Sequence, residues 1–350
     1  MSGLKIAAVY ASVFLGAGFA SGRELIEYFV SYGWIGLWGL IIAGVLFSLV
    51  GWAVLRICKR ESINDYSGFM RFLLGEKLGI FTEFLVIAFL FCLFVAMIAG
   101  GGATANEAFN IPFSFGAIIV GVVVFFILCF GLNGIVKVNV ILAPFMLLGG
   151  IFVGLFSFFS HTTYAFALIQ GGASSIAWIL AAKVYASYNL VTGIPVLTAT
   201  APLAINKFDA VIGGVLGGGV ITILGISMSL PLFLHYTNVV ALEIPFLYIV
   251  IQHGSFFNGL YLTILISALL TTAACNAFAV LEWLKARNRI KAAAILCILG
   301  VIASHVGFSV IVAYVYPVFG LVGLFKIIVI LWAGFGKAGH VSKDYSDTRG

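Results

Sequence analysis

Charge is scarce in this sequence of 350 residues. Only 9% of the residues are Asp, Glu, Lys or Arg, against about 25% in a typical soluble domain. A chain with so little charge cannot cover the surface of a water-soluble fold, which excludes soluble enzymes and soluble nucleic-acid binders. Strands of alternating polar and apolar residues are missing as well, which excludes an outer-membrane barrel. An all-α integral membrane protein remains, because a helix satisfies its own backbone hydrogen bonds in lipid.

Linkers, disulfide patterns and catalytic motifs are also missing. No run of proline, serine or like charge marks a linker, so we expect residues 1–350 to form a single membrane domain. The five cysteines contain no CxxC pair, which indicates small apolar residues rather than a disulfide framework or a metal site. There is no HExxH motif, no phosphate-binding loop and no Ser-His-Asp arrangement. We therefore expect that the protein is not an enzyme and holds no organic cofactor.

Long apolar segments are abundant, since 63% of the residues are hydrophobic. A helix needs about 20 apolar residues to cross a bilayer, and the apolar pattern predicts ten such helices. They cover residues 5–30, 34–56, 79–106, 111–131, 136–159, 174–203, 209–234, 257–284, 290–308 and 311–335. Pro317 leaves the boundary between the last two helices open. The short and more polar stretch 239–254 predicts a helical cap on one face.

Basic residues predict the orientation, because short cytoplasmic loops carry an excess of Lys and Arg. All of the 18 basic residues except Arg23, Lys183 and Lys326 fall in the tails or in alternate loops. We therefore expect a multi-pass protein of the inner (plasma) membrane with both termini in the cytoplasm. The net charge of +6 then serves to orient the chain against anionic lipid, and no nucleic-acid partner is expected. Lys326 is expected to snorkel toward the inner surface.

The first predicted helix carries Gly16, Gly18 and Gly22 in its middle. Each glycine costs about 1 kcal/mol in a helix interior, so three of them favour a break. Unwound backbone survives in a membrane only where it lines a cavity or contacts a bound solute. Close packing of small residues against a neighbouring helix is the alternative.

The sixth predicted helix has a crowded polar and aromatic centre, which favours a second break. The residues at this centre are Tyr185, Ser187, Tyr188 and Asn189, and Pro195 follows them. The halves 5–159 and 174–335 contain five predicted helices each. Because five is an odd number, the two halves must run in opposite orientations through the membrane. Interruptions at corresponding positions of such an inverted repeat indicate a transporter with its site near the membrane midplane. This interpretation depends on both interruptions.

Ala268, Thr271 and Thr272 share one face of the eighth predicted helix, because they occupy positions i, i+3 and i+4. They offer a carbonyl and two hydroxyl groups, which are neutral hard oxygens that suit a small hard cation. Alternatively, the hydroxyl groups bond to the preceding turn of their own helix. The broken first helix shifts the balance toward a cation site.

These features resemble the leucine-transporter (LeuT) fold, a five-plus-five inverted repeat with interrupted first and sixth helices. The closer resemblance is to the amino acid–polyamine–organocation superfamily and covers nearly the whole chain. Within it, the chain is similar to the YkvI-type bacterial membrane proteins through LGAGFASGREL at 15–25 and YASYNL at 185–190.

The resemblance implies a sodium ion and a small solute. The implied sodium ligands are the carbonyls of Ser12 and Leu15 together with Ala268, Thr271 and Thr272. The implied solute is an amino acid or a related compound, bound by Gly16, Ala17 and Gly18 and faced by Tyr185, Ser187, Tyr188 and Asn189. Some proton-coupled members of the superfamily have a Lys on the fifth helix in the place of the sodium ion. Our alignment puts Met146 at that position, and the absence of the Lys favours coupling to sodium over coupling to protons.

Arg23, Glu24 and Lys183 lie inside predicted helices, where ionisable residues are functional candidates by default. Arg23 and Glu24 are expected to form an external gate or cap, or else a cluster that snorkels to the interface. Lys183 is expected to pair with Glu24, to attract an acidic solute, or to replace the bound cation.

The sequence thus predicts a secondary active transporter of a small solute that couples to sodium and works by alternating access. A solute sensor of the same fold and a proton-coupled exchanger using Lys183 or Glu24 are the alternatives. The expected partners are the solute and the lipid bilayer, and the sequence leaves the oligomeric state open.

Overall fold

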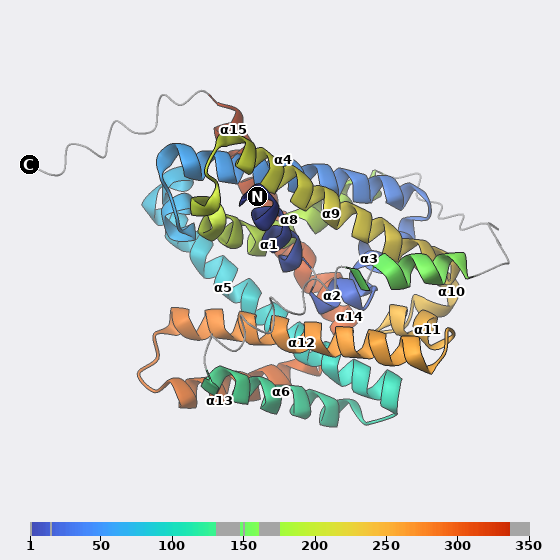
Figure 1. Cartoon of the computed structure of the whole chain (residues 1–350). Coiled ribbons are helices and arrows are strands. Elements are labelled where there is room, and N and C mark those ends of the chain that lie inside the picture. Colours follow the sequence, from blue (N-terminus) through green and yellow to red (C-terminus); the bar gives the residue numbers. More distant parts are fainter. Residues whose placement is uncertain (1, 15, 131–147, 150, 161–175, 337–350) are drawn as a thin grey trace, which may run out of the picture.

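The structure, a computed structural model, describes residues 2–14, 16–130, 148–149, 151–160 and 176–336. This part of the chain consists of helices joined by short connections and contains no strand (Figure 1). The predicted all-α class is confirmed. The predicted fifth helix, 136–159, falls largely outside the described residues, as does Met146, so the count of ten spans stays a prediction.

The first half of the chain begins with three short helices in the place of one long one. Its elements are α1 (Ser2–Val13), α2 (Ala17–Ala20), α3 (Arg23–Tyr28), η1 (Val30–Tyr32), α4 (Ile35–Glu61), α5 (Tyr66–Phe109) and α6 (Phe113–Phe130). α5 starts well before the predicted residue 79, because Asp65 caps it by accepting a hydrogen bond from the Gly68 N–H. Gly75 (φ 75°) then kinks it, so that residues 66–74 form a separate arm.

The second half consists of long helices and a short helical cap. Its elements are α8 (Ala177–Thr200), η2 (Ala201–Leu203), α9 (Lys207–Leu234), α10 (Tyr236–Val239), α11 (Pro245–Ile251), α12 (Ser255–Leu284), α13 (Arg289–Ser304), α14 (Phe308–Val310), the π-helical turn η3 (Ile311–Val315) and α15 (Tyr316–Phe335). The last helix therefore starts at Phe308, and Pro317 lies inside it. The cap predicted for 239–254 is present as α10 and α11.

The helices pack in two groups, which Figure 1 shows one above the other. α1, α4, α8, α9 and α15 contact one another, whereas α5 packs with α6, α12 and α13. Within the first group, α4 and α9 approach so closely that a Cβ on Gly214 would collide with the backbone of Gly51 and Trp52. Glycine therefore serves close helix packing at this contact.

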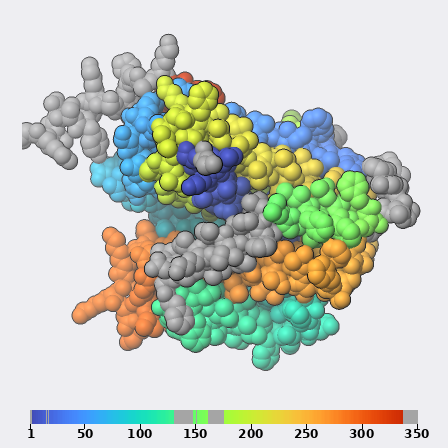
Figure 2. Space-filling view, in the orientation of Figure 1, coloured from blue at the N-terminus to red at the C-terminus, as the bar shows by residue number. Residues whose placement is uncertain are grey.

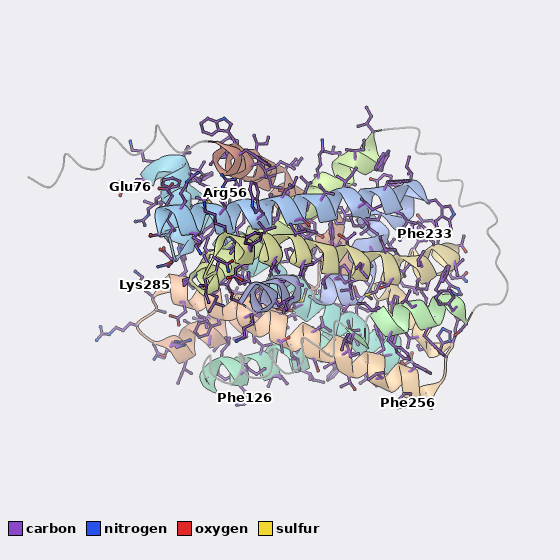
Figure 3. The ribbon with its side chains drawn as sticks, turned by 45° about the horizontal axis from the view of Figure 1, so that its top comes forward. Arg56, Glu76, Phe126, Phe233, Phe256 and Lys285 are labelled. Atoms are coloured by element: carbon purple, nitrogen blue, oxygen red, sulfur yellow. The ribbon has the colours of Figure 1, made fainter. Side chains whose placement is uncertain are left out.

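The described residues include five helices that are long and apolar enough to cross a membrane, namely α4, α5, α9, α12 and the helix Phe308–Phe335. Arg56, Glu76 and Lys285 lie at one end of the bundle, and Phe233 and Phe256 at the other (Figure 3). The protein is thus a multi-pass membrane protein, and which end faces the cytoplasm stays a prediction.

Lys326 does not snorkel as expected. Its side chain is 3% exposed, and its ammonium group donates a hydrogen bond of 3.4 Å to the hydroxyl of Tyr66. The arm that precedes the kink in α5 supplies Tyr66 and so gives the lysine a partner inside the bundle.

Candidate functional site

The first span is interrupted, as the glycines predict. α1 ends at Val13 and α2 begins at Ala17, and a second turn at Ser21 and Gly22 separates α2 from α3. Gly22 has a φ of 81°, which is a left-handed conformation that favours glycine. The predicted break of the first helix is therefore confirmed, while Leu15 lies outside the described residues.

The sixth span is not interrupted, and that prediction is wrong. α8 runs continuously through the polar centre and through Pro195. The polar groups bond within the helix, since the Asn189 amide donates to the Tyr185 carbonyl (3.0 Å) and the Thr192 hydroxyl donates to the Asn189 carbonyl (2.8 Å). Such back-bonding satisfies polar groups without unwinding the helix. The argument for a transporter from paired interruptions therefore fails, and a site can be built only on the break in the first span.

Ser187 and Asn189, which the resemblance implies would face the solute, are engaged in hydrogen bonds to helix carbonyls. The Ser187 hydroxyl donates to the carbonyl of Gly320 (2.6 Å) and lies against Gly323, so it joins α8 to α15. The small residues on α15 permit this contact, and Asn189 is engaged within its own helix. Neither side chain bonds to the first span.

Gly18, Glu24 and Tyr188 come together at the break. Glu24 projects from α3, is 7% exposed, and accepts a hydrogen bond of 2.9 Å from the Tyr188 hydroxyl at Oε2. Its Oε1 lies so close to Gly18 that a Cβ at that position would collide with it. Glu24 was expected in an external gate, whereas the structure places it beside two residues of the predicted solute site.

Tyr188 belongs to a cluster of four tyrosine rings. The ring centroids of Tyr28 lie 5.6 Å from Tyr185 and 5.4 Å from Tyr188, and Tyr188 lies 5.0 Å from Tyr316. Of these four, Tyr188 is bonded to Glu24. Among the described residues, the buried hydroxyl groups of Tyr185 and Tyr316 have no hydrogen-bond partner.

Sequence reasoning missed Tyr28 and Tyr316. Tyr28 had a signal, because it lies four residues after Glu24 and so shares its helix face. Its hydroxyl donates to the Val312 carbonyl (3.0 Å) in the π-helical turn η3. Pro317 follows this turn and lacks the N–H that would bond four residues back, which accounts for an irregular backbone there. Only the packing of α15 against α8 brings Tyr316 to the cluster.

Thr272, one of the predicted cation ligands, lies next to the same break. A Cβ on Gly16 would be 3.9 Å from the Oγ1 of Thr272 on α12, so the first span meets the second helix group there. Thr271 donates its hydroxyl hydrogen to the Ser267 carbonyl (2.8 Å), which is the alternative foreseen for it. A donating hydroxyl oxygen keeps its lone pairs for a cation. Ala268 is buried. The Ser12 hydroxyl donates to the Val9 carbonyl, so the candidate ligand from Ser12 is its backbone carbonyl.

Arg23 fastens the helical cap over the first span. Its guanidinium group donates to the carbonyls of Val240 (2.7 Å) and Leu242 (3.2 Å) and forms an ion pair with Glu27 (3.2 Å). The Phe246 N–H also donates to the Ser21 carbonyl (2.9 Å). Arg23 therefore belongs to a cap and does not snorkel.

Lys183 does not pair with Glu24. Its side chain is exposed on α8, whereas Glu24 is buried and bonded to Tyr188. The predicted pairing of Lys183 with Glu24 is therefore wrong.

A cavity of about 190 Å³ lies between α5, α6 and α12, away from this cluster. It is apolar, and none of the predicted site residues lines it. Within the described ranges, no group of three or more His, Cys, Asp or Glu side chains is placed to hold a metal ion.

The chain is similar to YkvI-type membrane proteins. It is 28% identical over 328 residues to YkvI, an uncharacterized membrane protein of Bacillus subtilis (strain 168), covering 92% of this chain and 93% of that protein. It is 25% identical over 336 residues to YyaD of the same organism, covering 94% and 96% of the two chains. No family model matches. The predicted resemblance to the YkvI-type proteins is confirmed.

The fold is that of known transporters. A mutant of the manganese transporter of Eremococcus coleocola superposes with a TM-score of 0.61 at 14% identity, covering 94% of this chain and 78% of that one. A Na+-coupled sialic acid symporter in an outward-open state superposes with a TM-score of 0.58 at 13% identity, covering 95% and 79%. The predicted LeuT-like fold is confirmed.

Proposed function

We propose that the protein is a secondary active transporter of a small solute, an amino acid or related compound, driven by sodium. It forms a single domain with both termini in the cytoplasm. One observation carries the proposal: the break in the first span lies between the two helix groups. Gly16 meets Thr272 of one group. Gly18 meets Glu24, which accepts a hydrogen bond from Tyr188 of the other group. The fold shared with a Na+-coupled symporter supports it.

A sodium ion at Gly16 and Thr272 would tie the two helix groups together. The carbonyls of Ser12 and Leu15, with Ala268, Thr271 and Thr272, supply the oxygens proposed to hold it. Binding that joins the groups selects one conformation of the transporter, and release allows the other. We do not propose manganese as cargo, because the described residues offer neutral oxygens here and no cluster of acidic or histidine ligands.

The test is uptake into liposomes by the purified full chain. Candidate solutes are first found by thermal shift against amino acids with and without sodium, because ligand binding raises Tm. An imposed sodium gradient is expected to drive uptake. The double substitution Thr271→Ala and Thr272→Ala should abolish the sodium dependence. Thr263→Ala, which removes an exposed hydroxyl of the same helix that bonds only to Gly259, should leave it unchanged.

Two outcomes would replace this proposal. If the double variant keeps its sodium dependence, the sodium ion is not bound by Thr271 and Thr272 of α12. Uptake that follows a pH gradient and ignores sodium identifies a proton-coupled exchanger, which the buried Glu24 favours as the second candidate. Ligand binding without flux in any gradient identifies a sensor.

A further inference from the structure

The cavity of about 190 Å³ between α5, α6 and α12 lies within the second helix group, away from the break in the first span (Figure 1). Its wall begins at Phe109 and Ile111, where α5 turns into α6 at the end of the bundle that carries the cap. It reaches Leu269 and Leu270, which lie at the middle of α12. Because α12 is long enough to cross a bilayer, half of its length corresponds to one leaflet.

The way in which α5 and α6 pack accounts for the hollow. A Cβ on Gly116 of α6 would collide with the Cβ of Ala105 on α5, so the two helices approach closely through small residues. Gly116 and Ala105 both line the cavity, and neither has a side chain long enough to fill it. The space between this helix pair and α12 therefore stays open.

The wall of the cavity suits hydrocarbon and not water. Thr104 supplies the one polar side chain among the described residues that line it, and its hydroxyl donates to the Gly100 carbonyl (2.7 Å). A buried water molecule needs two to four polar partners, so an apolar cavity stays dry. An apolar cavity of about 150 Å³ is large enough to hold benzene, so the cavity in this protein can hold a segment of hydrocarbon chain.

The mouth of the cavity opens on a surface that contacts lipid. Phe109 and Ile119 line the cavity and are nevertheless 52% and 55% exposed, and Ile266 on α12 is 37% exposed. Exposed apolar side chains on helices that cross a membrane face acyl chains. A helix of another protein is about 10–12 Å wide with its side chains, which is too wide for a space of this volume. A single acyl chain is narrow enough to enter.

We propose that this cavity binds one acyl chain of a phospholipid from the leaflet on the side of the cap. The chain enters beside Phe109 and Ile119 and ends against Leu270. Lipid tails are as apolar as leucine, so the chain gains no free energy from leaving water. It gains dispersion contacts with a wall that otherwise lacks partner atoms. The headgroup stays outside, so the site recognises the acyl chain and not the charge of the lipid.

This inference is independent of the proposed transport function, because it depends only on the membrane class of the protein and on the cavity. The first experiment uses the unmodified full-length chain in liposomes that contain a phosphatidylcholine with a photoactivatable diazirine in its acyl chain. Peptide mass spectrometry after irradiation should find labels concentrated on residues 101–120 and 266–270. The reference surface is α13, where Ile295, Ile298 and Ile302 are exposed but do not line the cavity. Equal labelling of the two surfaces would overturn the proposal.

The second experiment fills the cavity. Leu270→Phe and Ile266→Phe should each weaken the binding of dioleoyl phosphatidylcholine by about fivefold or more, because the added atoms occupy the space of the chain. Native mass spectrometry of the delipidated full-length protein in detergent measures the binding. Ile298→Phe is the matched control on the lipid-facing surface of α13 and should bind as the unmodified protein does. Unchanged binding in both filling variants would contradict the proposal.

The third experiment identifies which part of the lipid is recognised. Dioleoyl phosphatidylcholine should raise the Tm of the delipidated protein, whereas the dihexanoyl lipid, whose chains are too short, should not. The part of the Tm shift that Leu270→Phe removes should be the same for phosphatidylcholine and phosphatidylglycerol. A removed part that depends on the headgroup would contradict recognition of the chain. Displacement of the phospholipid by free oleate at equal concentration would show a site for free hydrophobic molecules instead.

Discussion

At the scale of single residues, the turn between α2 and α3 determines what the first span offers. The Ser21 hydroxyl donates to the Gly18 carbonyl (2.9 Å) and accepts from the Arg23 N–H (3.2 Å), which holds the turn in place. Glu24 therefore folds back against Gly18 instead of projecting along a continuous helix. A side chain at position 18 and the Glu24 carboxyl group compete for the same space.

Gly18→Ala tests this contact. The added methyl group is expected to displace Glu24 from Tyr188 and to lower the free energy of unfolding by about 1–3 kcal/mol, as overpacking does. Gly219→Ala is the control, because nothing lies within 4 Å of a Cβ at that position on α9. The control should be neutral or stabilising, since alanine favours a helix over glycine. Thermal unfolding in detergent measures both, and equal Tm values for the two variants would refute the contact.

At the scale of helices, the cap α10–α11 is held from several sides by charged side chains. Glu107 at the end of α5 accepts hydrogen bonds from the N–H groups of Glu243 (2.8 Å) and Ile244 (3.1 Å). The Glu243 carboxylate accepts in turn from the N–H of Ser309 (2.6 Å) and its hydroxyl (2.9 Å) on α14. The cap thereby connects the second helix group to the start of the last span.

Removal of the Glu107 carboxylate should loosen this cap. Glu107→Ala leaves two backbone N–H groups without their acceptor, at a cost of about 1.5–3 kcal/mol for each charged hydrogen bond. Faster hydrogen exchange is expected over residues 239–251, and slower or unchanged exchange would count against the connection. Glu76→Ala, at the opposite end of the bundle, is the control because that side chain is exposed (Figure 3).

At the scale of the whole molecule, the break in the first span lies between the two helix groups. The space-filling view shows helices of both groups at the surface, with α12 and α6 below the N-terminal helix (Figure 2). Because α1 packs on α9 while Gly16 reaches Thr272 on α12, a relative movement of the groups must change the surroundings of the break. Such a movement is what the alternating access proposed above would use.

The orientation in the membrane is tested by labelling. Lys285→Cys and Phe256→Cys place exposed thiols at opposite ends of α12 in a background without the native cysteines. In intact cells, a membrane-impermeant maleimide should label position 256 and spare position 285. Both positions should react after the membrane is opened. The reversed pattern would place the termini outside and contradict the orientation predicted from the basic loops.

The sequence by itself determined the membrane class, most helix bounds and the broken first span. Each of these follows from local properties, because apolar length and clustered glycine act within one segment whatever surrounds it. The same local reasoning failed at α8, where polar residues that suggested a break bond within their own helix. A polar side chain in lipid needs a partner, but the sequence does not say where that partner lies.

The tertiary structure alone decided which residues meet. It brought Tyr188 to Glu24, turned Ser187 toward α15 and left Lys183 exposed. Such contacts depend on how helices far apart in the chain pack, and a difference of one residue in rotation moves a side chain to another face. Thus the place of the break could be predicted from the chain, whereas the contact between Glu24 and Tyr188 and the packing of Tyr316 beside them could not.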